Sequence, residues 1–237
     1  MSNDYWLFLF ILLSTMFFIV RKKKLTSGAT IVAAAMGCII FLGTGFTGIV
    51  MIGLFFLLGT LATSFKLNVK EKLDAAEINK GRRTAGQVMA NGGVAAIAGI
   101  LASYFTTQVE LFALMMAGAL AAATADTLSS ELGTLYGKQF YNILNFKKDT
   151  RGENGVVSLE GTLIGMAGSA IIATVFSIGY GWDDRFCWII IAGTTGNFAD
   201  SFLGATLERK QILKNDAVNF INTLAGAFTV YILIEFL

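Results

Sequence analysis

Residues 124–161, TADTLSSELGTLYGKQFYNILNFKKDTRGENGVVSLEG, decide how the rest of the chain is interpreted. The stretch starts inside an apolar run that carries Asp126 and Glu131, and then crosses a polar loop rich in Lys and Arg. It enters the next apolar run through Ser158 and Glu160. Carboxylates in strongly apolar sequence are unfavourable and usually functional, so this stretch indicates a site.

The composition on both sides of this stretch is typical of a helical membrane protein. Of the 237 residues, 55% are hydrophobic and 14% are charged, whereas soluble domains have about 25% charged residues. The apolar runs are continuous and approach the length of a membrane-spanning helix, whereas a membrane β-barrel needs short strands of alternating hydrophobicity. We therefore predict an all-α, polytopic membrane helix bundle that forms one domain over residues 1–237.

The apolar runs predict about eight membrane spans. They cover residues 4–20, 28–42, 49–64, 84–105, 110–128, 158–179, 186–203 and 217–236. The first run is also a candidate signal peptide, but its positive cluster follows the apolar part, which favours a span. The chain has no proline, so glycines at 43, 45 and 48 predict the turn between the second and third spans. The segment KEKLDAAE, residues 70–77, is typical of a short amphipathic surface helix.

The basic residues predict the orientation of these spans. The loops after spans one, three, five and seven hold 17 of the 18 Lys and Arg residues, and only Arg185 lies on the other side. The positive-inside rule then places these loops in the cytoplasm and both termini outside, in an inner or plasma membrane.

The C-terminal half shows an internal repeat in the sequence. Residues 154–165, NGVVSLEGTLIG, align with residues 215–226, NDAVNFINTLAG, and Ala125-Asp126-Thr127 matches Ala199-Asp200-Ser201. The repeat units, about 109–180 and 186–237, have the same orientation because two helices separate the copies. Small and amide residues recur along the helices at helical spacing, which is also typical of simple helix packing. The repeat predicts that both aspartates contribute to one site at the cytoplasmic face.

The residue types limit the chemistry of such a site. The chain has no His, and its two Cys, Cys38 and Cys187, lie in apolar runs and are interpreted as buried small hydrophobic residues. Carboxylate and amide oxygens suit Mg²⁺ rather than zinc, and the nearby arginines suit phosphate. Glycines beside Asn154 precede a helix N-terminus, where backbone N–H groups can bind an anion. Mg²⁺, phosphate and a membrane setting together indicate phosphoryl transfer to or from a lipid, and the chain has no Walker A motif.

Five motifs resemble an integral-membrane family of unknown function that includes transmembrane protein 19 and the plant and cyanobacterial phytyl-phosphate kinase. The motifs are GRRTAGQVMANGG (81–93), ADTLSSELG (125–133), RGENGVVSLEGTLIG (151–165), NFADSFLGATLE (197–208) and NDAVNFINTLAG (215–226). The characterised branch of the family phosphorylates an isoprenyl monophosphate with CTP, and the resemblance implies the same for this chain. The residues that it implicates are Arg83, Asn91, Asp126, Ser130, Glu131, Arg151, Asn154, Ser158, Glu160, Asn197, Asp200, Asn215, Asp216 and Asn222.

Our leading hypothesis is therefore a membrane kinase with isoprenyl monophosphate, nucleotide and membrane lipid as partners, Mg²⁺ as cofactor and no nucleic-acid partner. The expected catalytic residues are Asp126, Glu131 and Asp200; the expected metal ligands are Asp126, Asp200, Glu160 and Asp216. Phosphate is expected to bind Arg83, Arg151, Asn154, Ser158 and Asn91, and the repeat adds Ser130, Asn197, Asn215, Asn219 and Asn222. A carrier of a lipid phosphate or another anion stays open, since midplane polar residues and parallel repeats occur in carriers. A scaffold explains the repeat but not the carboxylates.

Overall fold

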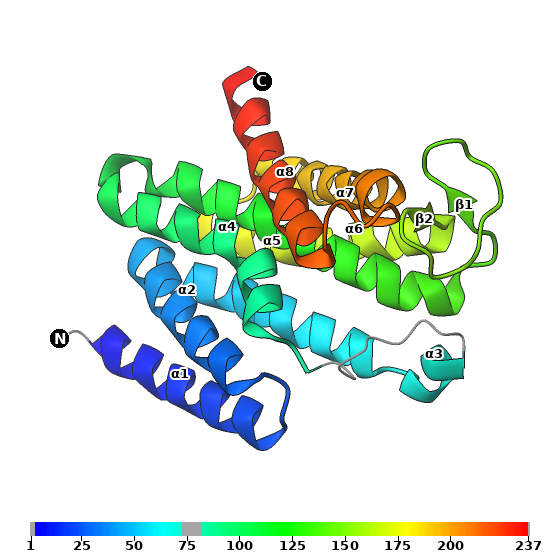
Figure 1. The fold of residues 1–237 in the computed structure, drawn as a ribbon. Helices are drawn as coiled ribbons and strands as arrows, with labels where there is room; N and C mark the ends of the chain where they lie inside the picture. The colour runs from blue at the N-terminus through cyan, green and yellow to red at the C-terminus, as the bar shows by residue number, and fades with distance from the viewer. Residues whose placement is uncertain (1–2, 73–81, 237) are drawn as a thin grey trace.

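The structure, a computed structural model, describes residues 3–72 and 82–236 as a bundle of helices (Figure 1). The helices are α1 (Asn3–Arg21), α2 (Ser27–Ser64), α3 (Leu67–Lys72), α4 (Ala85–Tyr104), η1 (Thr106–Gln108), α5 (Val109–Tyr136), α6 (Leu159–Tyr180), α7 (Arg185–Leu203), the π-helical turn η2 (Gly204–Glu208) and α8 (Asn215–Phe236). Two short antiparallel strands, β1 (Tyr141–Asn142) and β2 (Val156–Val157), pair in the loop between α5 and α6. The all-α prediction is confirmed, and this small sheet is an addition to it.

Helix α2 folds back on itself at Gly45. This residue has φ 62° and ψ −149°, a backbone conformation that is accessible to glycine and strained for other residues. A straight helix of 38 residues would be about 57 Å long, yet Lys24 Nζ, before the helix, donates a 2.8 Å hydrogen bond to Ser64 Oγ at its end. We call residues 27–44 the first limb and residues 46–64 the second limb, which run in opposite directions in Figure 1. The reversal lies within the turn that the glycines predicted.

In the part of the chain that the structure describes, six helical segments are long and apolar enough to cross a membrane. They are α1, α2, α4, η1 together with α5, α6 and α8. Helix α7, predicted from the sequence as a span of its own, is not among the six, because Thr194, Asn197 and Asp200 reduce its hydropathy. The sequence counted eight spans because it treated the two limbs of α2 separately and included α7.

Helix α5 lies at the centre of the bundle and contacts α2, α4, α6, α7 and α8. Its middle, from Ala117 to Ala123, is fully buried and consists of Ala, Gly and Leu. Small residues let neighbouring helix backbones approach closely. A Cβ added to Gly118 would lie 2.6 Å from the Gly226 carbonyl oxygen of α8, and one added to Gly133 would lie 2.7 Å from Gly161 Cα of α6. A Cβ added to Gly196 of α7 would likewise overlap with Ala122 Cβ of α5, so α6, α7 and α8 all pack closely against α5.

Two local predictions need correction. Helix α5 continues to Tyr136 rather than ending near Leu128, because Gly133 packs against α6 inside the helix instead of breaking it. The predicted surface helix at residues 70–77 is described only in part, as α3 ends at Lys72 and residues 73–81 lie outside the described residues. Within α3, Val69 is 45% exposed and Lys70 is 1% exposed, so Lys70 anchors a helix whose other side faces outward.

Candidate functional site

A polar cavity of about 150 Å³ lies between α5, α7, η2 and the loop before α6. We call it the carboxylate cavity, since Asp126, Asp200 and Glu208 line it. The other lining residues are Ser129, Ser130, Gly133, Thr134, Phe140, Gly152, Glu153, Asn154, Gly155, Val156, Val157, Ser158, Asn197, Ser201, Gly204 and Asn215. The cavity therefore joins the two aspartates of the sequence repeat to the loop that the first motif predicted.

Asp126 of α5 and Asp200 of α7 interact directly through their carboxyl groups. Glu208 adds a third negative group close enough to act on both. Two unit charges 4 Å apart repel by roughly 4 kcal/mol at the effective dielectric constant of a protein. Three carboxyl groups around one cavity therefore require protons, a cation or both for their compensation.

Unsatisfied polar atoms lie next to this aspartate pair. Within residues 3–72 and 82–236, Asp200 Oδ1 is buried without a hydrogen-bond partner, and so are both polar atoms of the Asn222 amide. Asn222 itself is 0% exposed. Buried polar atoms are nearly always paired with protein, water or an ion, so these atoms mark a place where a bound water or cation would satisfy them.

Glu208, which the sequence reasoning missed, lies at the end of η2. Burial raises the pKa of its carboxyl group, and hydrogen bonds with Asn215 and Asn154 act in the opposite direction. Glu208 is the last residue of the motif NFADSFLGATLE, and its position in that motif was the only sequence signal for it. Asn154 and Asn215 are the first residues of the two repeated segments, 154–165 and 215–226, so both segments contact the Glu208 carboxylate.

The loop that covers the cavity is attached to η2 by Arg209. The guanidinium donates from Nε to the Asn154 carbonyl oxygen at 2.6 Å and from Nη2 to Asp149 Oδ2 at 2.8 Å. Hydrogen bonds from Asn142, the Thr150 N–H and Arg209 lower the pKa of Asp149 to about 2. The loop is further shaped by positive φ angles at its two glycines, residues 152 and 155, which present the backbone to the cavity.

A second polar cavity of about 100 Å³ adjoins the first between α4, α5 and α8. We call it the arginine cavity, since Arg83 lines it. Its other lining residues are Gln87, Asn91, Asp126, Thr127, Ser130, Glu131, Asn215 and Asn219. Asp126, Ser130 and Asn215 line both cavities. Most predicted site residues of α4, α5, α7 and α8 thus gather around two adjoining cavities that meet at Asp126, whereas Asp216 and Asn222 of α8 line neither cavity.

Glu131 in the arginine cavity is paired with Lys70, a partner that the sequence gave no means of finding. Lys70 Nζ donates to Glu131 Oε2 and also to the carbonyl oxygens of Ala62 at 2.6 Å and Thr63 at 3.3 Å. These carbonyls lie in the last turn of α2, where carbonyl groups lack helical partners and favour a cation. Lys70 therefore fixes α3, the second limb of α2 and Glu131 to one another.

Four predicted site residues have other partners. Ser158 caps α6, where its Oγ accepts the Gly161 N–H at 3.1 Å. Arg151 donates to the Leu135 carbonyl oxygen at 3.2 Å, near the end of α5. Glu160 accepts the Lys138 N–H at 3.3 Å, and Asp216 is exposed beside Gly86. Of these four, only Ser158 lines either cavity.

A family model described as integral membrane protein DUF92 matches residues 10–227. The chain belongs to this DUF92 family. It is therefore an integral membrane protein with several membrane spans, and the predicted family resemblance is confirmed.

Three relatives resemble this DUF92 protein over most of its length. Protein VTE6, chloroplastic, of Arabidopsis thaliana is 31% identical over 93% of this chain and 69% of its own length. An uncharacterized membrane protein of Methanocaldococcus jannaschii is 34% identical, with 87% of this chain and 84% of the relative covered. One of Synechocystis is 32% identical, with 88% and 82% covered. No solved structure matches the chain.

The donor set of this DUF92 protein fits a magnesium ion better than a metal that needs many protein ligands. No group of three or more His, Cys, Asp or Glu in the described part of the chain is arranged to hold a metal ion. Mg²⁺ is commonly bound by one or two carboxylates, with water and substrate phosphates as the other ligands. Asp126 and Asp200, with the buried Asn222 amide beside them, match that pattern. Glu160 and Asp216 of the predicted ligand set line neither cavity, and Mg²⁺ binding stays a prediction.

Proposed function

We propose that this protein is a Mg²⁺-dependent membrane kinase that transfers the γ-phosphoryl group of a nucleotide, CTP in our proposal, to an isoprenyl monophosphate. The proposal is supported by the family relationship, since the family resemblance implies this activity. The structural observation that carries it is the Asp126–Asp200 pair. Both aspartates line the carboxylate cavity together with the backbone of residues 152–155, and Asp126 also lines the arginine cavity. A phosphate donor and a phosphate acceptor are both anionic, and this arrangement offers each of them a site beside the cation.

The chemistry needs no strong base. An oxygen of the isoprenyl monophosphate attacks the γ-phosphorus of the nucleotide, the bond from this phosphorus to the β–γ bridging oxygen breaks, and the products are isoprenyl diphosphate and the nucleoside diphosphate. The attacking oxygen already carries negative charge, so a chain without His is sufficient. Catalysis of such transfer is mainly positioning and charge neutralisation.

The residues divide these tasks in our proposal. Asp126 and Asp200 hold Mg²⁺, which when bound neutralises the negative charge of the donor phosphates. Arg83 positions the acceptor phosphate, and the backbone of residues 152–155 receives the phosphates of the nucleotide. Asn91, Asn197 and Asn219 complete the polar walls, while Glu131 is held by Lys70 and shapes the wall between Arg83 and Asp126.

We further propose that the site lies at the cytoplasmic face of an eight-span bundle with two related halves. Basic residues from two of the basic loops meet there. Lys70 and Arg83, from the loop after the third predicted span, respectively pair with Glu131 and line the arginine cavity, and Arg209, from the loop after the seventh, binds the loop before α6. At the other end of α5, Arg185 pairs with Glu110. The rise of 1.5 Å per residue places Glu110 and Glu131 about 32 Å apart, close to the ~30 Å of a hydrocarbon core.

The proposed activity is tested with purified protein in lipid nanodiscs, phytyl or farnesyl monophosphate, Mg²⁺ and γ-labelled nucleotides. We expect labelled isoprenyl diphosphate with CTP, and none when EDTA replaces Mg²⁺. The absence of product across the nucleotides and chain lengths would refute the kinase. Nucleotide-independent uptake of the lipid phosphate into proteoliposomes would support the carrier instead.

A further inference from the structure

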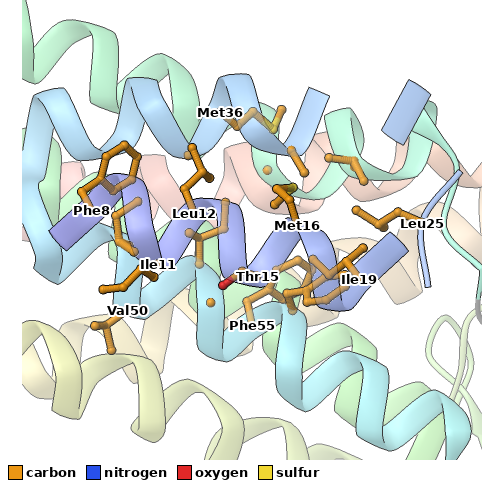
Figure 2. Close-up of a pocket in the computed structure, with 18 of the residues that line it drawn as sticks. Phe8, Ile11, Leu12, Thr15, Met16, Ile19, Leu25, Met36, Val50 and Phe55 are labelled. Atoms are coloured by element: carbon orange, nitrogen blue, oxygen red, sulfur yellow. The ribbon is translucent and has the colours of Figure 1, made fainter. Parts of the chain in front are cut away.

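An apolar groove of about 330 Å³ lies between α1, the two limbs of α2 and the start of α4. Figure 2 shows Leu12 and Met16 of α1 beside Met36 of the first limb, with Val50 and Phe55 of the second limb on the other side. This volume is within the range of sites that bind small apolar ligands, about 300–1,000 Å³. Voids inside packed protein cores rarely exceed the size of a water molecule, so the groove is more than loose packing.

Glycine keeps the middle of the groove open. Gly53 lines it, and a Cβ added to Gly53 would meet no atom within 4 Å. Helix α1 forms the outer wall with one face only, since Phe8 and Ile19 are 7% and 3% exposed while Phe17 on the opposite face is 66% exposed. The groove therefore has a lining of its own, distinct from the outward face of α1.

Arg83 connects this groove to the polar site. Among the described residues that line the groove, Arg83 and Thr15 are the polar side chains, and Arg83 also lines the arginine cavity. Its guanidinium carbon lies 5.0 Å from the ring centre of Phe55 and 5.8 Å from that of Phe56. A cation at the junction of an apolar groove and a polar cavity matches a ligand with an anionic head and an apolar tail.

We propose that the groove binds the isoprenoid tail of a lipid monophosphate whose phosphate group lies at Arg83. The identity of the ligand rests on the proposed function, whereas the location of its tail rests on the groove itself. From Phe55 back to Phe46, both in the lining, the second limb spans nine residues, or about 14 Å. The phosphate then lies beside Asp126, and the length of this wall limits the tail that fits.

The test uses a farnesyl monophosphate probe with a diazirine at the end of its tail, cross-linked to the full-length protein in nanodiscs and mapped by mass spectrometry. The substitution Gly53→Leu fills the groove, and Gly28→Leu is its control on the same helix, exposed and outside the lining. Both replace a helical glycine by a better helix former, so both variants are expected to fold.

We expect the label on residues of α1 and the second limb, with Gly53→Leu lowering the labelling affinity by about tenfold, since displacing two methylenes from an apolar site is sufficient for that factor. Gly28→Leu should label like the wild type. Four results would each refute binding of the tail in the groove. They are labelling confined to α5–α8, equal labelling affinity in Gly53→Leu and the wild type, no labelling, and equal competition by phosphatidylcholine. Labelling of the groove without phosphorylation by any nucleotide would instead refute the kinase and leave the groove intact.

Discussion

Replacing Lys70 by methionine is expected to destabilise the protein by about 3–5 kcal/mol, the range for removing one partner of a buried ion pair. Lys70 is 1% exposed and Glu131 11% exposed, so the carboxylate has little water to replace its partner. The substitution also leaves the carbonyl oxygens of Ala62 and Thr63 without the donor that they have now. Methionine keeps most of the length and the apolar stem of lysine, so the loss reports the ammonium group rather than a cavity.

A double-mutant cycle separates the ion pair from the surrounding packing. The variants are Lys70→Met, Glu131→Leu and the combination of the two, each purified in the same detergent and compared by denaturant and thermal unfolding. Replacing both partners of a buried pair by apolar residues is often neutral, so the double variant should be more stable than Lys70→Met alone. The expected coupling energy is about 2 kcal/mol or more, within the range for residues in direct contact.

The cycle also has a clear refuting result. It is a free energy of unfolding of Lys70→Met within about 0.5 kcal/mol of the wild-type value, as for most surface substitutions. That result would mean that the ammonium group is solvated and that the ion pair does not stabilise the fold. A coupling energy near zero would lead to the same conclusion. The matched control is Lys66→Met, because Lys66 is an exposed lysine just before the same short helix and should show no such effect.

Three further substitutions test other parts of the structure. Gly45→Val should destabilise the protein by about 1–3 kcal/mol in thermal unfolding because of the positive φ, whereas Gly53→Ala should not; equal effects would contradict the strained reversal. Arg209→Gln should speed proteolysis of residues 138–157, unlike Lys210→Gln. Because the pKa of Asp149 is lowered to about 2, the stability that its carboxylate contributes is present above the unfolded pKa near 3.8 and is lost only as pH falls through about 2. The rate of wild-type proteolysis should therefore be set by the same contact at pH 5 and pH 7, with equal protection of the loop. Mg²⁺ should raise the wild-type Tm by about 5 °C at saturation and EDTA should reverse this, whereas Asp200→Asn should lack the shift; a shift retained in that variant would exclude Asp200 as a ligand.

The helices themselves were largely predictable from the sequence, because each apolar run has to form its hydrogen bonds internally within a membrane. The reversal at Gly45 followed from the glycines in a chain without proline. The number of spans was less predictable, since α7 has the length of a span but carries polar residues that serve the carboxylate cavity. Hydropathy alone does not separate such a helix from a surface helix.

The site was predictable in its carboxylates and less so in their partners. The repeat pattern led to Asp126 and Asp200, which the structure brings together from two helices. Ser158 and Arg151 were expected to bind phosphate, but a serine that caps a helix and one that binds an anion occupy the same position in sequence, before a helix N-terminus. Lys70 and Glu208 were missed, since their burial depends on contacts between distant segments rather than on neighbouring residues.

The most direct test of the central claim is transfer of the γ-phosphoryl group from labelled CTP to phytyl monophosphate by the wild type and by Asp126→Asn in nanodiscs. The wild type should form labelled phytyl diphosphate only with Mg²⁺. Asp126→Asn should fold and express normally but lose at least about a thousandfold in kcat/KM, a loss of about 4 kcal/mol of transition-state stabilisation. Full activity in Asp126→Asn, or no transfer by the wild type, would contradict the assignment of the Asp126–Asp200 pair as the catalytic centre.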